Sequence, residues 1–233
     1  MLNFKIDLSS YEKDKAALFL FALTHIFNIE TVQHLFKEVN LSGPISIKMV
    51  PREQAPFGAM LEADRTILLA EDQYIFQAIN FLLFEFCNLI NPGFNHTVCS
   101  RYNTADAFAT AIEKVEYDSV KHHRQLMRAV VMDPHYKTIL KAEYPHVTED
   151  ILCKVREVIL NDFTDESFED ALQRLKTTKP GQLLSHYDTY KKFYQDWASQ
   201  NRPTGRKLPE LPPKVSGRKL PELPRKQVRS RPS

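Results

Sequence analysis

The sequence predicts an α+β domain, mostly helical with a small antiparallel sheet, followed by a disordered, basic and proline-rich C-terminal tail. Three observations lead to this fold class. Several long segments carry apolar residues at the spacing of amphipathic or buried helices. Short segments near the N-terminus alternate apolar and polar residues, as half-buried strands do. Beyond residue 201 these patterns end, and proline and basic residues dominate.

Length and charge divide the chain into a folded domain, residues 1–201, and a tail, residues 202–233. A chain of 233 residues with 43% hydrophobic content can bury one sizeable core. Residues 202–233 hold ten Lys or Arg and two Glu, a balance of +8, so the total of +2 leaves −6 for residues 1–201. An acidic domain argues against specific nucleic-acid binding, whereas the basic tail can contact acidic surfaces without specificity.

A short strand and two helices are expected near the N-terminus. Phe4 to Leu8 alternates as a strand, and Ser9 or Ser10 can cap a helix that begins near Tyr11. A second helix is expected over Ile29 to Val39.

Two further strands follow these helices. Ile45 to Val50 alternates cleanly, and Met60 to Leu69 indicates another strand that polar turn residues interrupt at positions 63–65. Together with the first strand, these segments predict the small antiparallel sheet.

The next segment predicts a long helix that is buried on nearly all sides. It begins at Glu71 or Asp72, ends at about Ile90, and is apolar around most of its circumference. Asn91-Pro92-Gly93 is expected to end it.

A second long helix is expected from Asn103 or Thr104 to about Met132, where Asp133-Pro134 stops it. At about 100° per residue, Glu116 and His123 fall at one margin of its apolar stripe, and Glu113 lies further toward solvent. The stripe consists of Phe108, Ala111, Ile112, Val115, Leu126 and Val130. Further helices are expected over 148–161, 165–176 and 183–199.

Cysteine usage and hydropathy indicate a protein of a reducing compartment. Cys87, Cys99 and Cys153 show no C-x-x-C spacing, so we expect free thiols and no cysteine metal site. The N-terminal residues lack the pattern of a cleaved export signal, and no apolar run reaches 18 residues, so neither an export signal nor a membrane span is expected. The sequence predicts no cofactor and does not indicate an oligomeric state.

Glu85 is the centre of the predicted chemistry. It is the sole acid in the apolar run from Phe81 to Cys87, where an unpaired carboxylate would cost several kcal/mol. It must therefore be protonated, paired or bound to a ligand. Asn88, three residues later, lies on the same helix face and can donate a hydrogen bond to it. The predicted catalytic set is Glu85, Asn88, Glu116 and His123.

Two interpretations of this set remain open. In the first, Glu85 is a general base or ligand of a hydrolase, with a pKa raised by its apolar helix. In the second, Glu85 and Asn88 form a polar contact that holds two buried helices in register. Glu116 and His123 are seven residues apart, about 10 Å along a helix, so the segment alone does not provide a complete mononuclear metal site.

The strands and the buried helix between residues 45 and 95 resemble the zincin metallopeptidase arrangement, in which a helix carries His-Glu-x-x-His. The corresponding residues here are Phe84-Glu85-Phe86-Cys87-Asn88. Only the glutamate is retained, and both imidazole ligands are absent. The resemblance therefore implies a degenerate, zincin-like scaffold.

A second resemblance rests on two helices. Phe84-Glu85-x-x-Asn88, followed by Ile112-Glu113-x-x-Glu116-Tyr117-Asp118-Ser119 and a His-His pair, is similar to uncharacterised domains of bacterial effector and toxin proteins. The resemblance implies that the buried Glu, the Asn and the Glu-Tyr helix form one polar cluster. It implies no particular activity.

The tail contains a duplicated heptad. Arg206 to Pro212 recurs unchanged twelve residues later as Arg218 to Pro224. Because proline fixes φ and lacks an N–H, each copy should sample the extended polyproline II helix, which aligns its Leu-Pro pairs along one edge. The predicted binding residues are Arg206, Leu208, Pro209, Leu211 and Pro212 in the first copy and Arg218, Leu220, Pro221, Leu223 and Pro224 in the second.

Arg-x-Leu-Pro-x-Leu-Pro resembles the ligand of an SH3 domain, in which two proline-containing pairs fill aromatic slots and a cation meets an acidic pocket. Lys214 and Lys226 add a basic residue two positions beyond the last proline of each heptad. The resemblance implies an SH3-type partner. The alternative interpretation is a soluble spacer rich in proline and charge.

A eukaryote-type SH3 ligand combined with the effector-like helices predicts a bacterial effector that acts in virulence. We expect such a protein to be secreted by a signal-independent route into the host cytosol, and otherwise to be cytoplasmic. Its expected function is protein–protein interaction, with a hydrolase as the alternative.

Overall fold

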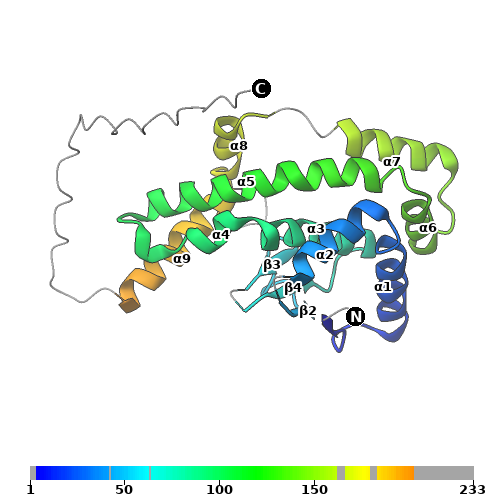
Figure 1. Ribbon diagram of the computed structural model, residues 1–233, viewed down its shortest axis with the longest axis horizontal. Coiled ribbons are helices and arrows are strands. Elements are labelled where there is room, and N and C mark those ends of the chain that lie inside the picture. The colour runs from blue at the N-terminus through cyan, green and yellow to red at the C-terminus, as the bar shows by residue number, and fades with distance from the viewer. Residues whose placement is uncertain (1–3, 42, 63, 162–165, 179–182, 202–233) are drawn as a thin grey trace, which may run out of the picture. The chain divides into compact units, whose positions relative to one another are not determined.

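The described residues are mostly helical and contain a four-stranded sheet. Figure 1 shows the arrangement of these elements in this computed structural model. The structure describes residues 4–41, 43–62, 64–161, 166–178 and 183–201. Contacts between residues separate the chain into two units, residues 1–200 and 201–233. The duplicated heptad therefore lies outside the described residues.

The sheet is mixed and mostly parallel, with the strand order β1-β2-β4-β3. β1 (Phe4–Asp7) pairs in parallel with β2 (Ile45–Val50), and β2 pairs in parallel with β4 (Thr66–Ala70). Only β3 (Ala59–Leu61) is antiparallel to its neighbour, β4. The predicted antiparallel sheet is therefore wrong for two of the three pairings.

The parallel pairing of β1 and β2 follows from the two helices between them. α1 (Lys13–Ile26) and α2 (Glu30–Leu41) form a crossover that returns the chain to the end of the sheet from which it started. The expected break in the third strand is a hairpin turn, in which Arg65 adopts a positive φ of 66° and the Asp64 carboxylate accepts a hydrogen bond from the Thr66 amide at 3.0 Å. This turn makes β3 and β4 antiparallel.

α3 (Ile75–Ile90) packs on β3 and β4 and is the central helix of the folded unit. Its predicted burial is confirmed, since Leu82 and Phe86 are at most 1% exposed. The helix begins at Ile75, a few residues later than predicted. There the backbone amides of Ile75 and Phe76 donate to the carboxylate of Glu143 at 2.6 and 3.0 Å, so an acid distant in sequence caps the helix.

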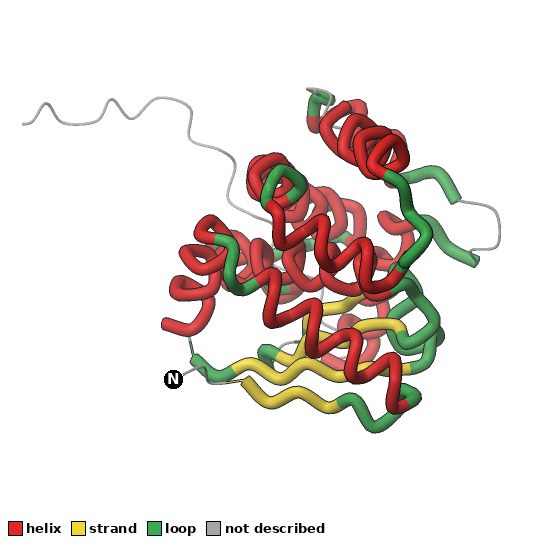
Figure 2. Tube along the Cα trace, turned by 90° about the vertical axis from the view of Figure 1, so that its right-hand side faces the viewer, coloured by secondary structure: helices red, strands yellow, loops and turns green. Residues whose placement is uncertain are grey.

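α5 (Ala105–Val130) packs on the side of α3 and matches the predicted second long helix. The Thr104 hydroxyl caps it by accepting from the amide of Ala107 at 3.1 Å. The sheet, α3 and α5 thus form successive layers, and Figure 2 shows the strands gathered on one side of the helices. α5 is therefore in position to place side chains against α3.

Two helices begin at prolines that were predicted only to end the preceding helix. α4 (Pro92–His96) and α6 (Pro134–Glu143) both carry proline at their first turn. Asn91 and Asp133 act as N-caps, accepting from the amides of Gly93 and His135 at 2.9 Å. Proline at the first helical position has no amide to leave unpaired, so Asn-Pro and Asp-Pro end one helix and start the next.

The remaining helices agree with the expected segments. They are α7 (Glu149–Asn161), α8 (Phe168–Leu175) and α9 (His186–Asn201), and a short 3₁₀ turn, η1 (Cys99–Arg101), precedes α5. Tyr194 of α9 is buried with Phe108 of α5 in a separate aromatic cluster. α9 therefore covers part of the predicted apolar stripe of α5.

No single helix of the described residues is long and apolar enough to cross a membrane. α1 and α2 together have the length and apolar composition of a membrane span, but a bend of 100° separates the two helices.

Candidate functional site

Glu85 and Asn88 lie one turn apart on the buried face of α3. Glu85 is 5% exposed and Asn88 is 2% exposed. The Asn88 side-chain amide donates to Glu85 Oε2 at 2.8 Å, as their spacing predicts. Asn88 Oδ1 is buried and has no hydrogen-bond partner among the described residues.

The surroundings of Glu85 favour its neutral form. Burial raises the pKa of Glu85 to about 8, against the opposing effect of the Asn88 hydrogen bond. The negative charge of Glu116 raises this pKa further, and the charge of His186 lowers it. Glu85 is therefore electrostatically coupled to α5 and α9, and it can gain or lose a proton near neutral pH.

α5 contributes two carboxylates to this region. Glu116 has a side chain that is 13% exposed, whereas the Glu113 side chain is completely buried. The expectation that Glu113 lies toward solvent is therefore wrong. The expectation assumed an uncovered helix, but α9 packs against this face through Tyr187, whose hydroxyl lies 3.2 Å from that of Thr110.

Local hydrogen bonds fix the start of α9 and place His186 in its first turn. The Ser185 hydroxyl accepts from the Asp188 amide at 3.0 Å and donates to the Asp188 carboxylate at 2.7 Å. This is a capping arrangement in which a serine and an acid three residues later satisfy each other. Ser185 is fully buried, so the start of the helix and the orientation of His186 are fixed together.

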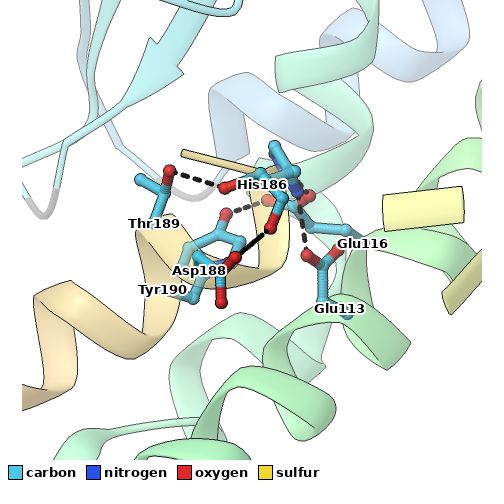
Figure 3. A network of polar contacts seen from close by, with 7 residues as sticks. Glu113, Glu116, His186, Asp188, Thr189 and Tyr190 are labelled. Carbon is cyan, nitrogen blue, oxygen red and sulfur yellow. Dashed lines mark hydrogen bonds and ion pairs between the residues drawn. The ribbon is translucent and has the colours of Figure 1, made fainter. Parts of the chain in front are cut away.

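His186 lies between the two carboxylates of α5, as Figure 3 shows. Its Nδ1 is 3.0 Å from Glu113 Oε1, and its Nε2 is 3.6 Å from Glu116 Oε2. Burial acts to lower the pKa of His186, but the negative charges of Glu116 and Glu113 outweigh burial and raise this pKa to about 9. Only Nδ1 is within hydrogen-bond distance of its acid, whereas Nε2 meets Glu116 at ion-pair distance, so protonated His186 is the counter-charge of both acids.

Tyr190 completes the contact one turn after His186. Its hydroxyl donates to Glu116 Oε1. Burial and the neighbouring Glu116 raise the pKa of Tyr190 well above its ordinary value, so the hydroxyl keeps its proton. The rings of Tyr190 and Phe57 meet the imidazole edge-on, with centroids at 5.2 and 4.8 Å, and His186 remains 24% exposed as the outer member of the cluster.

His123 is not seen to join this cluster, although the sequence analysis grouped it with Glu85. Its ring packs edge-on against Phe84 at 5.8 Å, further along α5. Burial lowers the pKa of His123 to about 4, so the imidazole is neutral, and the described contacts do not link it to Glu85 or Glu116. Two turns of helix separate it from Glu116, which is the physical reason for the failed grouping.

His186, Glu113 and Tyr190 were not among the predicted catalytic residues. The sequence held a weak signal, because Glu113 and Glu116 are three residues apart and His186 and Tyr190 are four apart, which places each pair on one helix face. The signal was hidden because Tyr190 belongs to an aromatic stripe that is typical of core packing.

The resulting cluster is an unusual concentration of buried charge. Two carboxyl groups of α5 lie beside one imidazole of α9, and the charges of Glu116 and His186 act on the pKa of Glu85 in α3. Glu113 Oε2 is buried and lacks a hydrogen-bond partner among the described residues. Such an arrangement can shift protons between neighbouring acids or bind a cation.

Comparison with known proteins provides no match: no family model, no curated protein and no solved structure resembles this chain significantly. The resemblances to zincins and to bacterial effector domains therefore remain predictions. The interpretation of the cluster rests on its own geometry.

Proposed function

We propose that this chain is a translocated, bacterial effector-like interaction protein whose tail, residues 202–233, recruits SH3-type domains of host proteins in the host cytosol. The observation that carries the proposal is the unchanged repetition of Arg-Lys-Leu-Pro-Glu-Leu-Pro at Arg206 and at Arg218. A spacer requires only a suitable amino-acid composition and not a particular order of residues. The duplication instead preserves every position that an SH3 ligand uses, including both prolines and the preceding arginine.

The last helix of the folded unit, α9, supports this proposal because it is anchored to the rest of that unit. α9 ends at Asn201, only five residues before Arg206. The helix is anchored near its middle by Tyr194, which is 3% exposed and whose hydroxyl donates to the Tyr102 carbonyl at 2.7 Å. The first copy of the heptad therefore follows an anchored helix closely in the sequence.

The two copies allow bivalent binding. A twelve-residue offset spans roughly 20 to 35 Å in partly extended chain, which is enough for two small domains side by side. A partner with paired SH3 domains would bind the second copy at a high effective concentration. The opposite charge of the tail and of an acidic SH3 pocket would also speed association.

The test is the binding of a peptide covering Arg206 to Lys226 to a panel of SH3 domains by calorimetry. We expect replacement of Pro209, Pro212, Pro221 and Pro224 by alanine to weaken binding at least about tenfold, a change of about 1.4 kcal/mol. This variant preserves every charge, so it separates docking of the polyproline helix from simple electrostatic attraction. Equal binding of the native and alanine peptides would overturn the proposal.

A second test places the interaction in a cell. Full-length protein should retain an SH3 protein from host lysate, and the four-alanine variant should lose it. A variant with only one intact heptad should bind a single SH3 domain normally but lose the avidity for a tandem partner. If neither full-length protein nor peptide distinguishes native from alanine sequence, the tail is a spacer.

One structural observation favours a second candidate function, a hydrolase that uses the buried cluster. Asn88 is hydrogen-bonded to Glu85, and the charges of Glu116 and His186 act on the pKa of Glu85. A carboxyl group beside a second acid and an imidazole can act as a general base, and the raised pKa of Glu85 supports this role near neutral pH. The degenerate zincin resemblance suggests peptide bonds as the substrate class.

This candidate is tested with a library of quenched fluorescent peptides. Glu85→Gln preserves shape and the buried position, and it removes the ability to accept a proton. We expect cleavage to fall by about 100-fold or more in this variant, the scale of general base catalysis. Cleavage by the native chain at the same rate as by the variant would exclude Glu85 from any hydrolysis.

A further inference from the structure

The geometry points to a binding site for one divalent transition-metal cation, held by Glu113 and Glu116 of α5 and His186 of α9. This inference deepens the hydrolase candidate and is independent of the recruitment of SH3 domains. It concerns binding, so it stands or fails without an identified substrate.

The three side chains already have the spacing of a metal site. One ligand atom from each residue can be chosen so that all three lie within 4.8 Å of one another. Ligands at about 2.0 to 2.2 Å from a tetrahedral ion are about 3.4 Å apart. One ion takes only one imidazole nitrogen, and that nitrogen must lose its proton on binding. The limit of 4.8 Å exceeds the ideal separation by about 1.4 Å, so side-chain rotations must bring the three ligand atoms closer together.

An unpartnered atom indicates that the cluster is incomplete without a ligand. The side chain of Glu113 is completely buried, and its Oε2 has no hydrogen-bond partner among the described residues. A buried acceptor without a donor costs about 1–3 kcal/mol, and more when the group is charged. A cation between Glu113 and Glu116 would remove this cost. Figure 3 shows the Glu113 side chain directed at His186.

The neighbours of the three residues are arranged as supporting groups. The Tyr190 hydroxyl binds Glu116 Oε1 and leaves Glu116 Oε2 facing His186. Ser185 and Asp188 fix the helix end that carries the imidazole. Hydrogen bonds of this kind hold metal ligands in place and contribute to affinity. The charges of Glu116 and His186 also act on the pKa of Glu85 in α3.

The ligand set selects the class of cation. Two carboxylates and one imidazole suit Zn²⁺, Mn²⁺ or Fe²⁺, whereas Ca²⁺ and Mg²⁺ prefer oxygen ligands alone. Among the described residues, the group of possible ligands at this position contains no cysteine. Three protein ligands leave a coordination position for water or substrate, as in catalytic zinc sites.

The experiment is a titration of the metal-stripped full-length chain with Zn²⁺ by calorimetry, followed by Co²⁺ substitution and X-ray absorption. We expect one ion per chain, a tetrahedral or five-coordinate Co²⁺ spectrum, and a first shell of nitrogen and oxygen without sulfur. Glu113→Gln, Glu116→Gln and His186→Gln should each weaken binding at least about 100-fold, because each removes a direct ligand.

Matched controls separate the site from adventitious binding. His122→Gln replaces an exposed histidine of the same helix, and Glu53→Gln replaces an exposed acid, so both should bind Zn²⁺ as the native chain does. Circular dichroism establishes which variants are folded. If the three ligand variants fail to fold, the stoichiometry and the absorption spectrum of the native chain decide.

Three results would overturn the site: no one-to-one binding, a first shell containing sulfur, or undiminished affinity in folded Glu113→Gln or His186→Gln protein. Peptide cleavage is scored separately. Metal binding without cleavage would retain the site and remove the hydrolase candidate, whereas Glu85-dependent cleavage by metal-free protein would retain the hydrolase and remove the metal from its mechanism. Loss of SH3 binding in the alanine variants is unaffected by either result.

Discussion

Each half of α5 lies in a region that contains one histidine, and the pKa values of the two imidazoles shift in opposite directions. His123 packs against Phe84, and burial lowers its pKa to about 4. His186 meets the first half of α5, where burial is outweighed by Glu116 and Glu113 and its pKa rises to about 9. Burial by itself removes the charge from a histidine, whereas buried acids restore it. For these two histidines, the charges of neighbouring side chains decide the protonation state more than the degree of burial does.

The largest effect on stability is expected when the cation His186 is removed from beside Glu113 and Glu116. His186→Ala leaves Glu113 and Glu116 buried and facing each other without a counter-charge. Loss of one partner from a buried charge cluster costs about 3–5 kcal/mol, and we expect the lower part of that range because His186 is partly exposed. Urea unfolding of the metal-free protein at pH 7 measures the loss.

A second substitution provides the control for this experiment. Glu113→Gln combined with His186→Ala removes one of the two opposed charges, and it should recover a substantial part of the lost stability. Equal stability of the single and double variants would show that the loss comes from packing and not from charge.

The contribution of His123 to the free energy of unfolding is expected to depend on pH. The folded pKa of His123, about 4, lies below the value of about 6.5 in an unfolded chain, so between these values the unfolded chain binds more protons. The contribution of neutral His123 to stability is therefore fully present above pH 6.5 and is lost as pH falls toward 4. The full loss is about 3 kcal/mol, from about 1.4 kcal/mol per pH unit.

This effect is isolated by comparison with a variant that does not titrate. His123→Phe should flatten the dependence of unfolding free energy on pH between 6.5 and 4, while the carboxylates of the remaining protein titrate in both chains. Arg124 and His122, whose charges also bear on His123, are unchanged in the variant. Identical slopes in the two proteins would mean that His123 is accessible to protons in the folded state.

The smallest expected effect concerns the helix that caps α3. Asp133 starts α6, and α6 carries Glu143, whose carboxylate accepts the first two amides of α3. Asp133→Ala should cost about 1 kcal/mol, the usual value of an N-cap, and Thr104→Ala at the start of α5 provides a matched cap without this downstream link. Hydrogen exchange of the Ile75 and Phe76 amides should rise only in the Asp133 variant.

Much of the helical structure could be predicted because periodicity is a local property. The long helices α3 and α5, the hairpin turn at Arg65 and the burial of Glu85 with its Asn88 partner all follow from spacing along the chain. Two helix starts escaped prediction because Asn-Pro and Asp-Pro signal both an end and a beginning. The direction of strand pairing escaped because it depends on the path of the intervening helices.

The position of Glu85 inside an apolar helix already requires that this acid be neutralised or paired, whatever the rest of the chain does. The tertiary structure alone decided the partners. Glu113 became buried because α9 covers it, and His186 reached the acids of α5 although about seventy residues separate them in the chain. The physical reason is that periodicity fixes a side chain's place on its own helix, while the partner of a buried charge is fixed only when two helices pack.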